Sequence, residues 1–181
     1  MESQQPESAI VIPVPEAEAL VGAWRMRYDP VAEHGVPAHV TLLYPFCPPN
    51  GIDEALVEDL ARVVAGFEPF DFELNGVSRF PLITWLVPSP AERFIAITEA
   101  IVACFPEFPP YCGRFDDIVP HLTVIHGHDR PDEYPAVDAE FRRRIAGHLP
   151  LKARAGEVQL MVSNADQTWS VEAKLALGTR R

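Results

Sequence analysis

The sequence predicts an α+β fold in a single domain spanning residues 1–181. Three observations favour this class. Apolar residues recur at helical spacing in some segments and alternate with polar residues in others. Helices and strands follow one another in mixed order, and several strands are close enough in sequence to form antiparallel hairpins. With 181 residues, of which 48% are hydrophobic and 23% charged, the chain is long enough to bury a substantial core.

Nineteen prolines, together with glycines and capping residues, divide the chain into short elements. Pro15 suits the first turn of a helix, where its missing N–H costs nothing, and Asp53 suits an N-cap. Within the strand over 151–162, the alternation shifts at Gly156, as a β-bulge would shift it. The expected elements, in order, are a strand over 9–14, a helix over 15–28, a strand over 39–44, a helix over 53–66, a hairpin of strands over 70–75 and 83–87, a helix over 90–105, a strand over 121–125, a helix over 132–147, and two strands over 151–162 and 169–177.

The order of these elements is repeated along the chain. The first half has a strand, a helix, a strand that begins with histidine, a helix and a hairpin. The second half has a helix, a strand that begins with histidine, a helix and a hairpin. This repetition predicts an internal duplication, with two pseudo-symmetric lobes that each contain one histidine strand.

The two histidine strands carry the same short pattern, about eighty residues apart. His39-Val-Thr41 and His121-Leu-Thr123 each place one apolar residue between a histidine and a threonine. On a strand, residues i and i+2 point to the same face, so each pattern puts an imidazole beside a hydroxyl. With six histidines, two chance occurrences of His-x-Ser/Thr are expected in roughly one chain in twenty. The matched placement, one per half at the start of an apolar strand, favours a site over chance.

Two such pairs facing one another would bind and cleave a phosphodiester without a metal. Hydrolysis needs a base to deprotonate water and an acid to protonate the departing oxygen. Histidine suits both roles, because its unperturbed pKa of about 6.5 is close to working pH. The threonine hydroxyls would donate hydrogen bonds to charge that develops on the phosphoryl oxygens.

The charge of the chain restricts its partners. Its net charge is −11, from 15 Lys and Arg against 26 Asp and Glu, which disfavours a DNA duplex or a long RNA and favours a small anionic ligand. The three cysteines form no CxxC pair, the first residues have no basic-then-apolar pattern, and no apolar run approaches the roughly 18 residues of a membrane span. We therefore expect a cytoplasmic protein without a membrane partner.

Two strings, VPAHVTLLYPF (36–46) and IVPHLTVIHG (118–127), resemble the doubled signature of the two-histidine (2H) phosphoesterase superfamily, specifically its 2'-5' RNA ligase-like and cyclic phosphodiesterase members. The opening AIVIPVPEAEALV and the closing TWSVEAKLALG also resemble the first and last elements of such proteins. The resemblance therefore covers nearly the whole chain, and the doubled motif is its specific part.

The resemblance implies two lobes, each an antiparallel sheet flanked by helices, around a cleft where the motifs face one another. It implies His39 and His121 as the catalytic proton-transfer pair, and Thr41 and Thr123 as the residues that bind the substrate phosphate. The implied enzyme hydrolyses small cyclic phosphates of the 2',3'-cyclic nucleotide type, or 2'-5'-linked nucleotides, without a cofactor. Its partner would be a small nucleotide, with RNA ends as a further partner.

Three alternatives stay open at this point. The chain could carry 2'-5' RNA ligase activity, which would need an RNA-binding surface that the acidic balance does not favour. It could be a nucleotide- or RNA-binding module without catalysis, although a pure binder has no need of two proton-transfer groups. It could also be a structural domain in which both histidines are buried.

Other residues could complete the site. Several aromatic residues lie near the expected edges of the cleft and could stack on a base; they are Tyr44, Phe46, Phe80, Trp85 and Phe115. With His121, His126 and His128 form an H-x4-H-x-H string, but no Asp or Glu stands at a clear ligand spacing, so we expect no metal site. The run 142–144 of three arginines is expected to lie on a solvated helix face.

Overall fold

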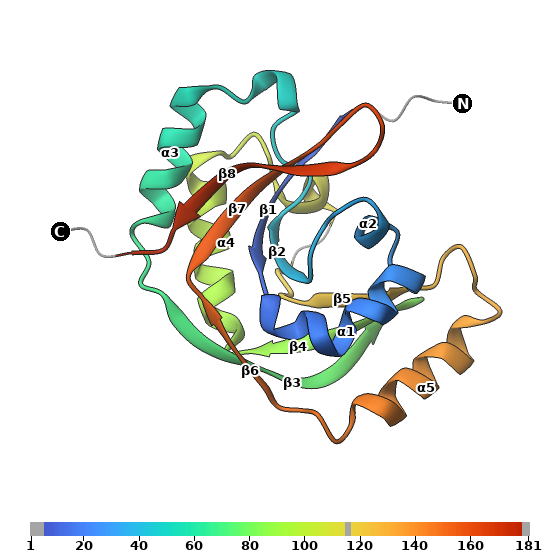
Figure 1. The fold of residues 1–181 in the computed structure, drawn as a ribbon. Coiled ribbons are helices and arrows are strands. Elements are labelled where there is room, and N and C mark those ends of the chain that lie inside the picture. Colours follow the sequence, from blue (N-terminus) through green and yellow to red (C-terminus); the bar gives the residue numbers. More distant parts are fainter. Residues whose placement is uncertain (1–5, 115–116, 179–181) are drawn as a thin grey trace.

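The structure is a computed structural model that describes residues 6–114 and 117–178. Within these residues the chain forms two four-stranded antiparallel sheets with helices packed around them (Figure 1). The α+β class is confirmed. The strands are β1 (Ser8–Pro13), β2 (His39–Leu43), β3 (Phe70–Phe80), β4 (Ile83–Ser89), β5 (Leu122–His126), β6 (Leu151–Ala155), β7 (Glu157–Ser163) and β8 (Trp169–Ala176). The helices are α1 (Pro15–Tyr28), α2 (Pro30–Glu33), α3 (Glu54–Val64), α4 (Ala91–Cys104) and α5 (Tyr134–Ile145), with short 3-10 turns at Pro49–Gly51 and Pro110–Gly113.

The two sheets have matching orders, β2-β1-β7-β8 and β5-β4-β3-β6. In each sheet the histidine strand is at an edge: β2 pairs only with β1, and β5 only with β4, among the described residues. Each half of the chain contributes strands to both sheets, because β1 and β2 enter the first sheet while β3 and β4 enter the second. The expected lobes therefore exist, but they do not coincide with the two halves of the sequence.

Gly156 marks the point where the chain changes sheets. The sequence predicted one bulged strand over 151–162, and this prediction is wrong. Instead β6 ends at Ala155 and pairs with β3, whereas β7 begins at Glu157 and pairs with β1 and β8. When the chain passes from one sheet to the other, the face of the strand that is buried changes. The alternation of apolar and polar residues then shifts by one position, as it would at a β-bulge.

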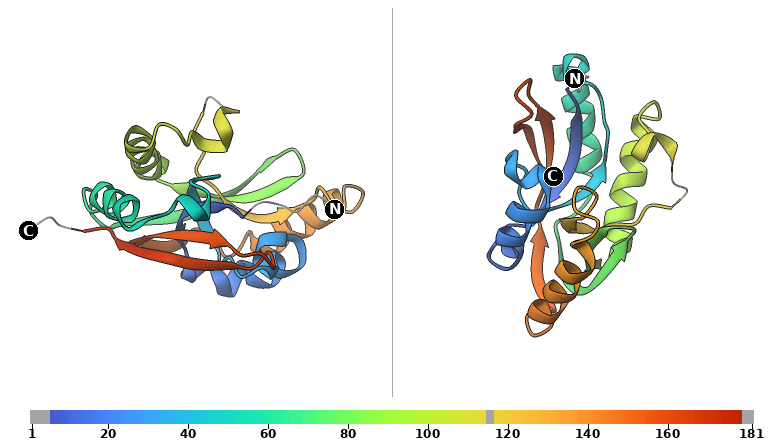
Figure 2. Two further views of the ribbon diagram at one scale, coloured as in Figure 1. Left: turned by 90° about the horizontal axis from the view of Figure 1, so that it is seen from above. Right: turned by 90° about the vertical axis from the view of Figure 1, so that its right-hand side faces the viewer.

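A helix can pack against the sheet to which the strand before it does not belong. Helix α1 packs against β5 and β6 of the second sheet, and α4 contacts β2 of the first. Helices α3 and α4 lie on one side of the molecule and α1 and α5 on the other (Figure 2). One continuous apolar cluster draws on both sheets and includes Ile10, Val40, Leu86, Phe94 and Leu122, all fully buried. No described helix is long and apolar enough to cross a membrane.

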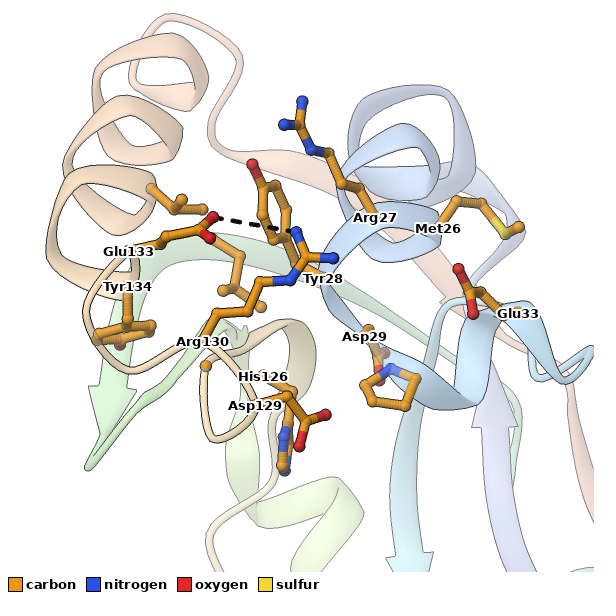
Figure 3. Close-up of a pocket in the computed structure, with 14 residues that line it drawn as sticks. Met26, Arg27, Tyr28, Asp29, Glu33, His126, Asp129, Arg130, Glu133 and Tyr134 are labelled. Carbon is orange, nitrogen blue, oxygen red and sulfur yellow. Dashed lines mark ion pairs between the residues drawn. The ribbon is translucent and has the colours of Figure 1, made fainter.

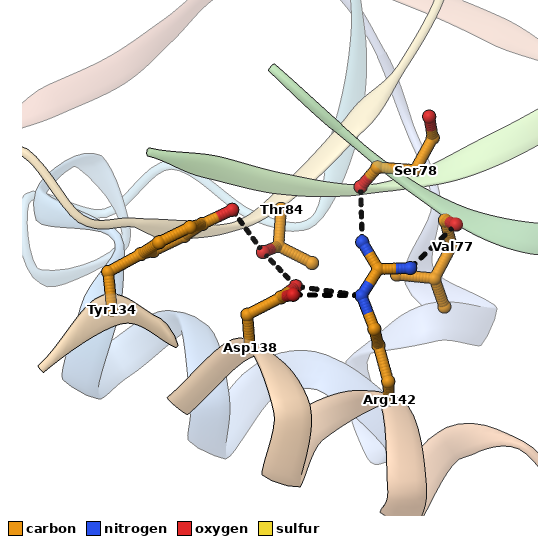
Figure 4. A network of polar contacts seen from close by, with 6 residues as sticks. All are labelled: Val77, Ser78, Thr84, Tyr134, Asp138 and Arg142. Atoms are coloured by element: carbon orange, nitrogen blue, oxygen red, sulfur yellow. Dashed lines mark hydrogen bonds and ion pairs between the residues drawn. The ribbon is translucent and has the colours of Figure 1, made fainter. Parts of the chain in front are cut away.

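A buried polar network attaches α5 to the second sheet (Figure 4). The Thr84 hydroxyl, on β4, donates to an Asp138 carboxylate oxygen at 2.6 Å and lies 2.9 Å from the Tyr134 hydroxyl. Arg142 binds the Asp138 carboxylate at 2.9 Å and donates to the carbonyl of Val77 at 3.0 Å. Arg142 therefore joins α5 to β3 instead of lying on a solvated face, whereas Arg143 and Arg144 are exposed and pair with Glu140.

Candidate active site

The two histidine strands lie beside each other at the junction of the sheets. Strand β2, at the edge of the first sheet, contacts β5, at the edge of the second (Figure 1). His39 is the first residue of β2, and His121 immediately precedes β5. The rings are close enough to interact electrostatically, since the charge of His121 lowers the pKa of His39. The topology thus brings together two motifs that are far apart in sequence.

Each histidine is held by the same backbone hydrogen bond. The Nδ1 atom of His39 lies 2.7 Å from the carbonyl oxygen of Pro37, and that of His121 lies 2.7 Å from the carbonyl oxygen of Val119. Because a carbonyl only accepts, the proton of each neutral ring is placed on Nδ1. The Nε2 atom of each ring then keeps its lone pair and can take up a proton.

Burial keeps both rings neutral at neutral pH. Burial first, and then the nearby charge of Arg25, lower the pKa of His39 to about 4, against the opposing effect of the hydrogen bond to Pro37. Burial also lowers the pKa of His121, against the effect of its bond to Val119. A neutral imidazole can act as a base at once, and the arrival of an anionic phosphate favours its protonated form.

The two threonines of the motifs are partly accessible. Thr41 and Thr123 are both half-buried, and they lie two residues after their histidines on the same strands. Within the described part of the chain, neither hydroxyl makes a hydrogen bond. Each is therefore available to donate to a bound ligand beside its histidine.

Two aromatic rings surround His121. Phe80 meets it edge-on, with ring centroids 5.1 Å apart and planes at 89°, and the centroid of Trp85 lies at 5.7 Å. Trp85 is 7% exposed and pairs with Thr123 across β4 and β5, so it supports the second motif from the neighbouring strand. Phe80 is half-buried and leaves part of its ring accessible.

The other predicted aromatics are placed differently. Tyr44 follows β2, and its hydroxyl donates to a Glu7 carboxylate oxygen at 2.6 Å while its ring meets Tyr111 edge-on. Phe46 is 4% exposed and packs against Phe105 and Phe108, a core position that leaves no face for a base. Phe115 lies outside the described residues.

A separate pocket lies at the other end of β5 (Figure 3). Its volume is about 210 Å³. Figure 3 shows His126, the last residue of β5, and Asp129, in the segment after it, with Asp29 opposite them, just after the end of α1. No group of three or more His, Cys, Asp or Glu within the described residues is arranged to hold a metal ion. The pocket carries charges of both signs, so its lining does not favour one class of ligand.

Sequence reasoning missed Arg25, which is 2% exposed and close to His39. The buried residues of α1 are Ala17, Val21 and Arg25, so a charged side chain shares the buried face of this helix with two apolar ones. One signal was present: Arg25 stands four residues after Val21 and four before Asp29. This spacing puts an arginine on the buried face with a carboxylate to pair with.

Comparison with known proteins gives a consistent result. The family model described as the 2'-5' RNA ligase superfamily matches residues 13–167. A protein of Oceanobacillus iheyensis, OB1230, assigned by name to the phosphoesterases, is 25% identical over 173 residues, which are 93% of this chain and 95% of that protein. The crystal structure of E. coli LigT complexed with 3'-AMP has a TM-score of 0.61 at 13% identity, covering 97% of this chain and all of that one. TT0787 of Thermus thermophilus has a TM-score of 0.61 at 18% identity, covering 96% of this chain and all of that one.

Proposed function

This chain belongs to the 2'-5' RNA ligase superfamily, and on that premise we propose that it is a metal-independent phosphodiesterase that uses His39 and His121 as its two proton-transfer groups. Its substrates are small cyclic phosphates of the 2',3'-cyclic nucleotide type or 2'-5'-linked nucleotides. One histidine takes a proton from water as it attacks phosphorus, and the other gives a proton to the departing ribose oxygen. The hydroxyls of Thr41 and Thr123 donate to the non-bridging oxygens, where charge builds up.

One observation carries this proposal: the two motifs have the same internal geometry. Both histidines bind the carbonyl two residues earlier at 2.7 Å, and both are followed at i+2 by a hydroxyl without a partner among the described residues. A buried histidine kept only for packing would not require this match. One neutral base, one histidine that takes up a proton when the anionic phosphate arrives, and two neutral donors suit a phosphodiester, which already carries a negative charge.

Charge and relatives support a small nucleotide as the ligand. The net charge of −11 acts against a long RNA, which disfavours ligation of RNA ends as the main activity. The solved structures of E. coli LigT include complexes with 3'-AMP, ATP and NADP+. We extend this binding of nucleotides to the present chain.

The test is a substrate screen with the unaltered protein and the double variant His39→Asn/His121→Asn. Asparagine keeps a nitrogen donor for the carbonyls of Pro37 and Val119 but cannot transfer a proton. The screen contains 2',3'-cyclic nucleotides, 2'-5'-linked dinucleotides and RNA with cyclic phosphate and 5'-hydroxyl ends, each with and without EDTA. We expect hydrolysis of a small substrate that EDTA leaves unchanged and the double variant lacks.

Three results would contradict the proposal. Hydrolysis that the double variant retains would place the chemistry elsewhere. Tight nucleotide binding with no turnover of any compound in the screen would support a binding module instead. Joining of RNA ends without hydrolysis would favour the ligase.

A further inference from the structure

The segment that leads into His39 is held by two charged side chains of α1. A Glu18 carboxylate oxygen accepts a hydrogen bond from the backbone N–H of Ala38 at 2.5 Å. Arg25 donates through Nη1 to the carbonyl of Val36 at 3.1 Å. Between these two contacts lies Pro37, whose carbonyl accepts the hydrogen bond from His39. The carbonyl that orients His39 is therefore fixed on both sides by α1.

Arg25 is itself fixed by Asp29, one turn later. Its Nε and Nη2 atoms bind the same Asp29 carboxylate oxygen at 3.1 and 2.9 Å. The two residues are only 2% and 4% exposed. A buried ion pair is often no more stabilising than apolar residues of similar volume, because both charges lose their hydration. Its presence here therefore suggests a task other than stability.

The guanidinium of Arg25 directs Nη1 to the carbonyl of Val36, three residues before His39, and Nε and Nη2 to Asp29. Two charged groups affect His39: Arg25 from α1 and His121 from the segment before β5. The carboxylate of Asp29 instead affects His126, whose pKa it raises against the effect of burial. Arg25 thus brings a positive charge to the segment before His39, where it lowers the pKa of that histidine.

The second histidine lacks such support among the residues that the structure describes. Its orienting carbonyl belongs to Val119, which is 43% exposed. Within the same described residues, no charged side chain bonds to the segment 117–120, and Arg25, which lowers the pKa of His39, is not among the groups that shift the pKa of His121. Both motifs have the hydrogen bond from histidine to a carbonyl, but among the described residues only the segment before His39 is held by charged side chains.

We propose that Arg25, oriented by Asp29, is a positioning residue for His39: it fixes the carbonyl segment that orients the ring and places a buried positive charge beside it, which makes the two histidines electrostatically unequal. The inference rests on the proposed function for its catalytic meaning. Its physical content, a cation that acts on one histidine and not on the other, holds without any substrate.

The test is a histidine titration by NMR in the ligand-free protein, which follows His39 and His121 separately. The main variant is Arg25→Met/Asp29→Asn, which removes both charges together and leaves no buried charge of this pair without its partner. We expect the titration midpoint of His39 to rise by about one pH unit and that of His121 to stay unchanged. Arg27→Met is the matched control, because Arg27 is exposed on the same helix; it should move neither midpoint.

Arg25→Lys separates the charge from the geometry. Lysine keeps the positive charge but cannot bind Asp29 and Val36 at once with a planar fork. We expect the His39 midpoint to stay near that of the unaltered protein. When a substrate is known, kcat should fall about tenfold at nearly constant KM, since His39 is misplaced while phosphate binding is kept. This variant also gives an answer if the double variant does not fold.

The outcomes distinguish this inference from the proposed function. A His39 midpoint that is unaltered in the double variant, or that moves together with that of His121, would overturn the positioning role. So would an Arg25→Lys variant with full kcat. A protein that turns over no phosphodiester but shows the selective shift of His39 would refute the proposed function and leave the electrostatic inequality in place.

Discussion

Each histidine of the site is held by a backbone carbonyl two residues before it, and this bond decides what the ring can do. With Nδ1–H bound to Pro37 or Val119, the free atom is Nε2, which can accept a proton from water or, once protonated, donate it to a leaving group. The threonine beside each ring adds a donor that carries no charge. The proposed chemistry therefore depends on four side chains and two carbonyls.

The hydroxyls of Thr41 and Thr123 can be tested by substitution. Thr41→Val and Thr123→Val keep the branched shape of the side chain but remove the donor, so each should lower kcat/KM for a cyclic nucleotide by about tenfold to a hundredfold. Thr41→Ser and Thr123→Ser keep the hydroxyl and serve as controls, with most of the activity retained. The measurement is steady-state kinetics together with thermal unfolding. A valine variant as active as its serine counterpart would show that the hydroxyl does not contact the phosphate.

At the scale of elements, the contact between β5 and α5 depends on a glycine. A Cβ atom at Gly127 would overlap the ring of Tyr134, closer than atoms in contact can come. The hydroxyl of Tyr134 is also near Thr84, in the network that includes Asp138 and Arg142 (Figure 4). Moving this ring would therefore disturb the attachment of α5 to the second sheet.

We predict that Gly127→Ala destabilises the protein by about 1–3 kcal/mol, the usual cost of forcing an extra methyl group into a packed site. Gly147→Ala is the control, because a Cβ atom there would meet no described atom within 4 Å. Urea unfolding of both variants measures the difference. Equal stability of the two variants would mean that the segment after β5 shifts at little cost.

Sequence periodicity predicted most elements because each buries a face of fixed spacing. The boundaries of α1 and the pairing of β3 with β4 agree with the predicted helix and hairpin. Hydrophobic periodicity alone did not predict that Arg25 is buried, because a charged residue on a helix is normally solvated. Arg25 is buried together with its hydrogen-bond acceptors, the carbonyl of Val36 and the carboxylate of Asp29. It could not separate β6 from β7 either, because a bulge and a change of sheet both shift the alternation at Gly156.

For the whole molecule, the exchange of strands between the halves makes the site. The chain places β2 and β5 at the edges of different sheets, and the shared core holds these edges together. The matched placement of the two motifs, one per half at the start of an apolar strand, predicted that they belong to one site. The contact between β2 and β5 depends on the order of the strands in the two sheets and on the packing of α1 and α4 against them. A local sequence pattern does not encode these long-range features.

The buried histidines also affect the stability of the whole molecule. Burial lowers the pKa of His39 to about 4 and lowers the pKa values of His121 and His126. Unfolded histidines have a pKa of about 6.5, so the unfolded chain binds more protons below that pH, and the free energy of unfolding falls as pH decreases. This contribution is fully present above about pH 6.5 and is lost progressively toward pH 4.

We therefore predict that the Tm decreases between about pH 7.5 and pH 5, where most carboxylates do not yet titrate. His39→Asn should show a smaller decrease, because it removes one of the groups that takes up a proton on unfolding. Differential scanning calorimetry of the two proteins across this range measures the effect. An equal decrease in both proteins would show that His39 titrates normally in the folded state.

Catalysis by His39 and His121 is tested by measuring kcat/KM for 2',3'-cyclic AMP in His39→Asn and His121→Asn, with His126→Asn as the matched control. His126 lies at the far end of β5 from His121 and outside the proposed pair. Each proton transfer contributes typically 10²–10⁴-fold to the rate. The two-histidine mechanism therefore predicts that kcat/KM falls by at least about 10²-fold in each of the first two variants and stays nearly unchanged in the third. Full activity in either His39→Asn or His121→Asn would contradict it.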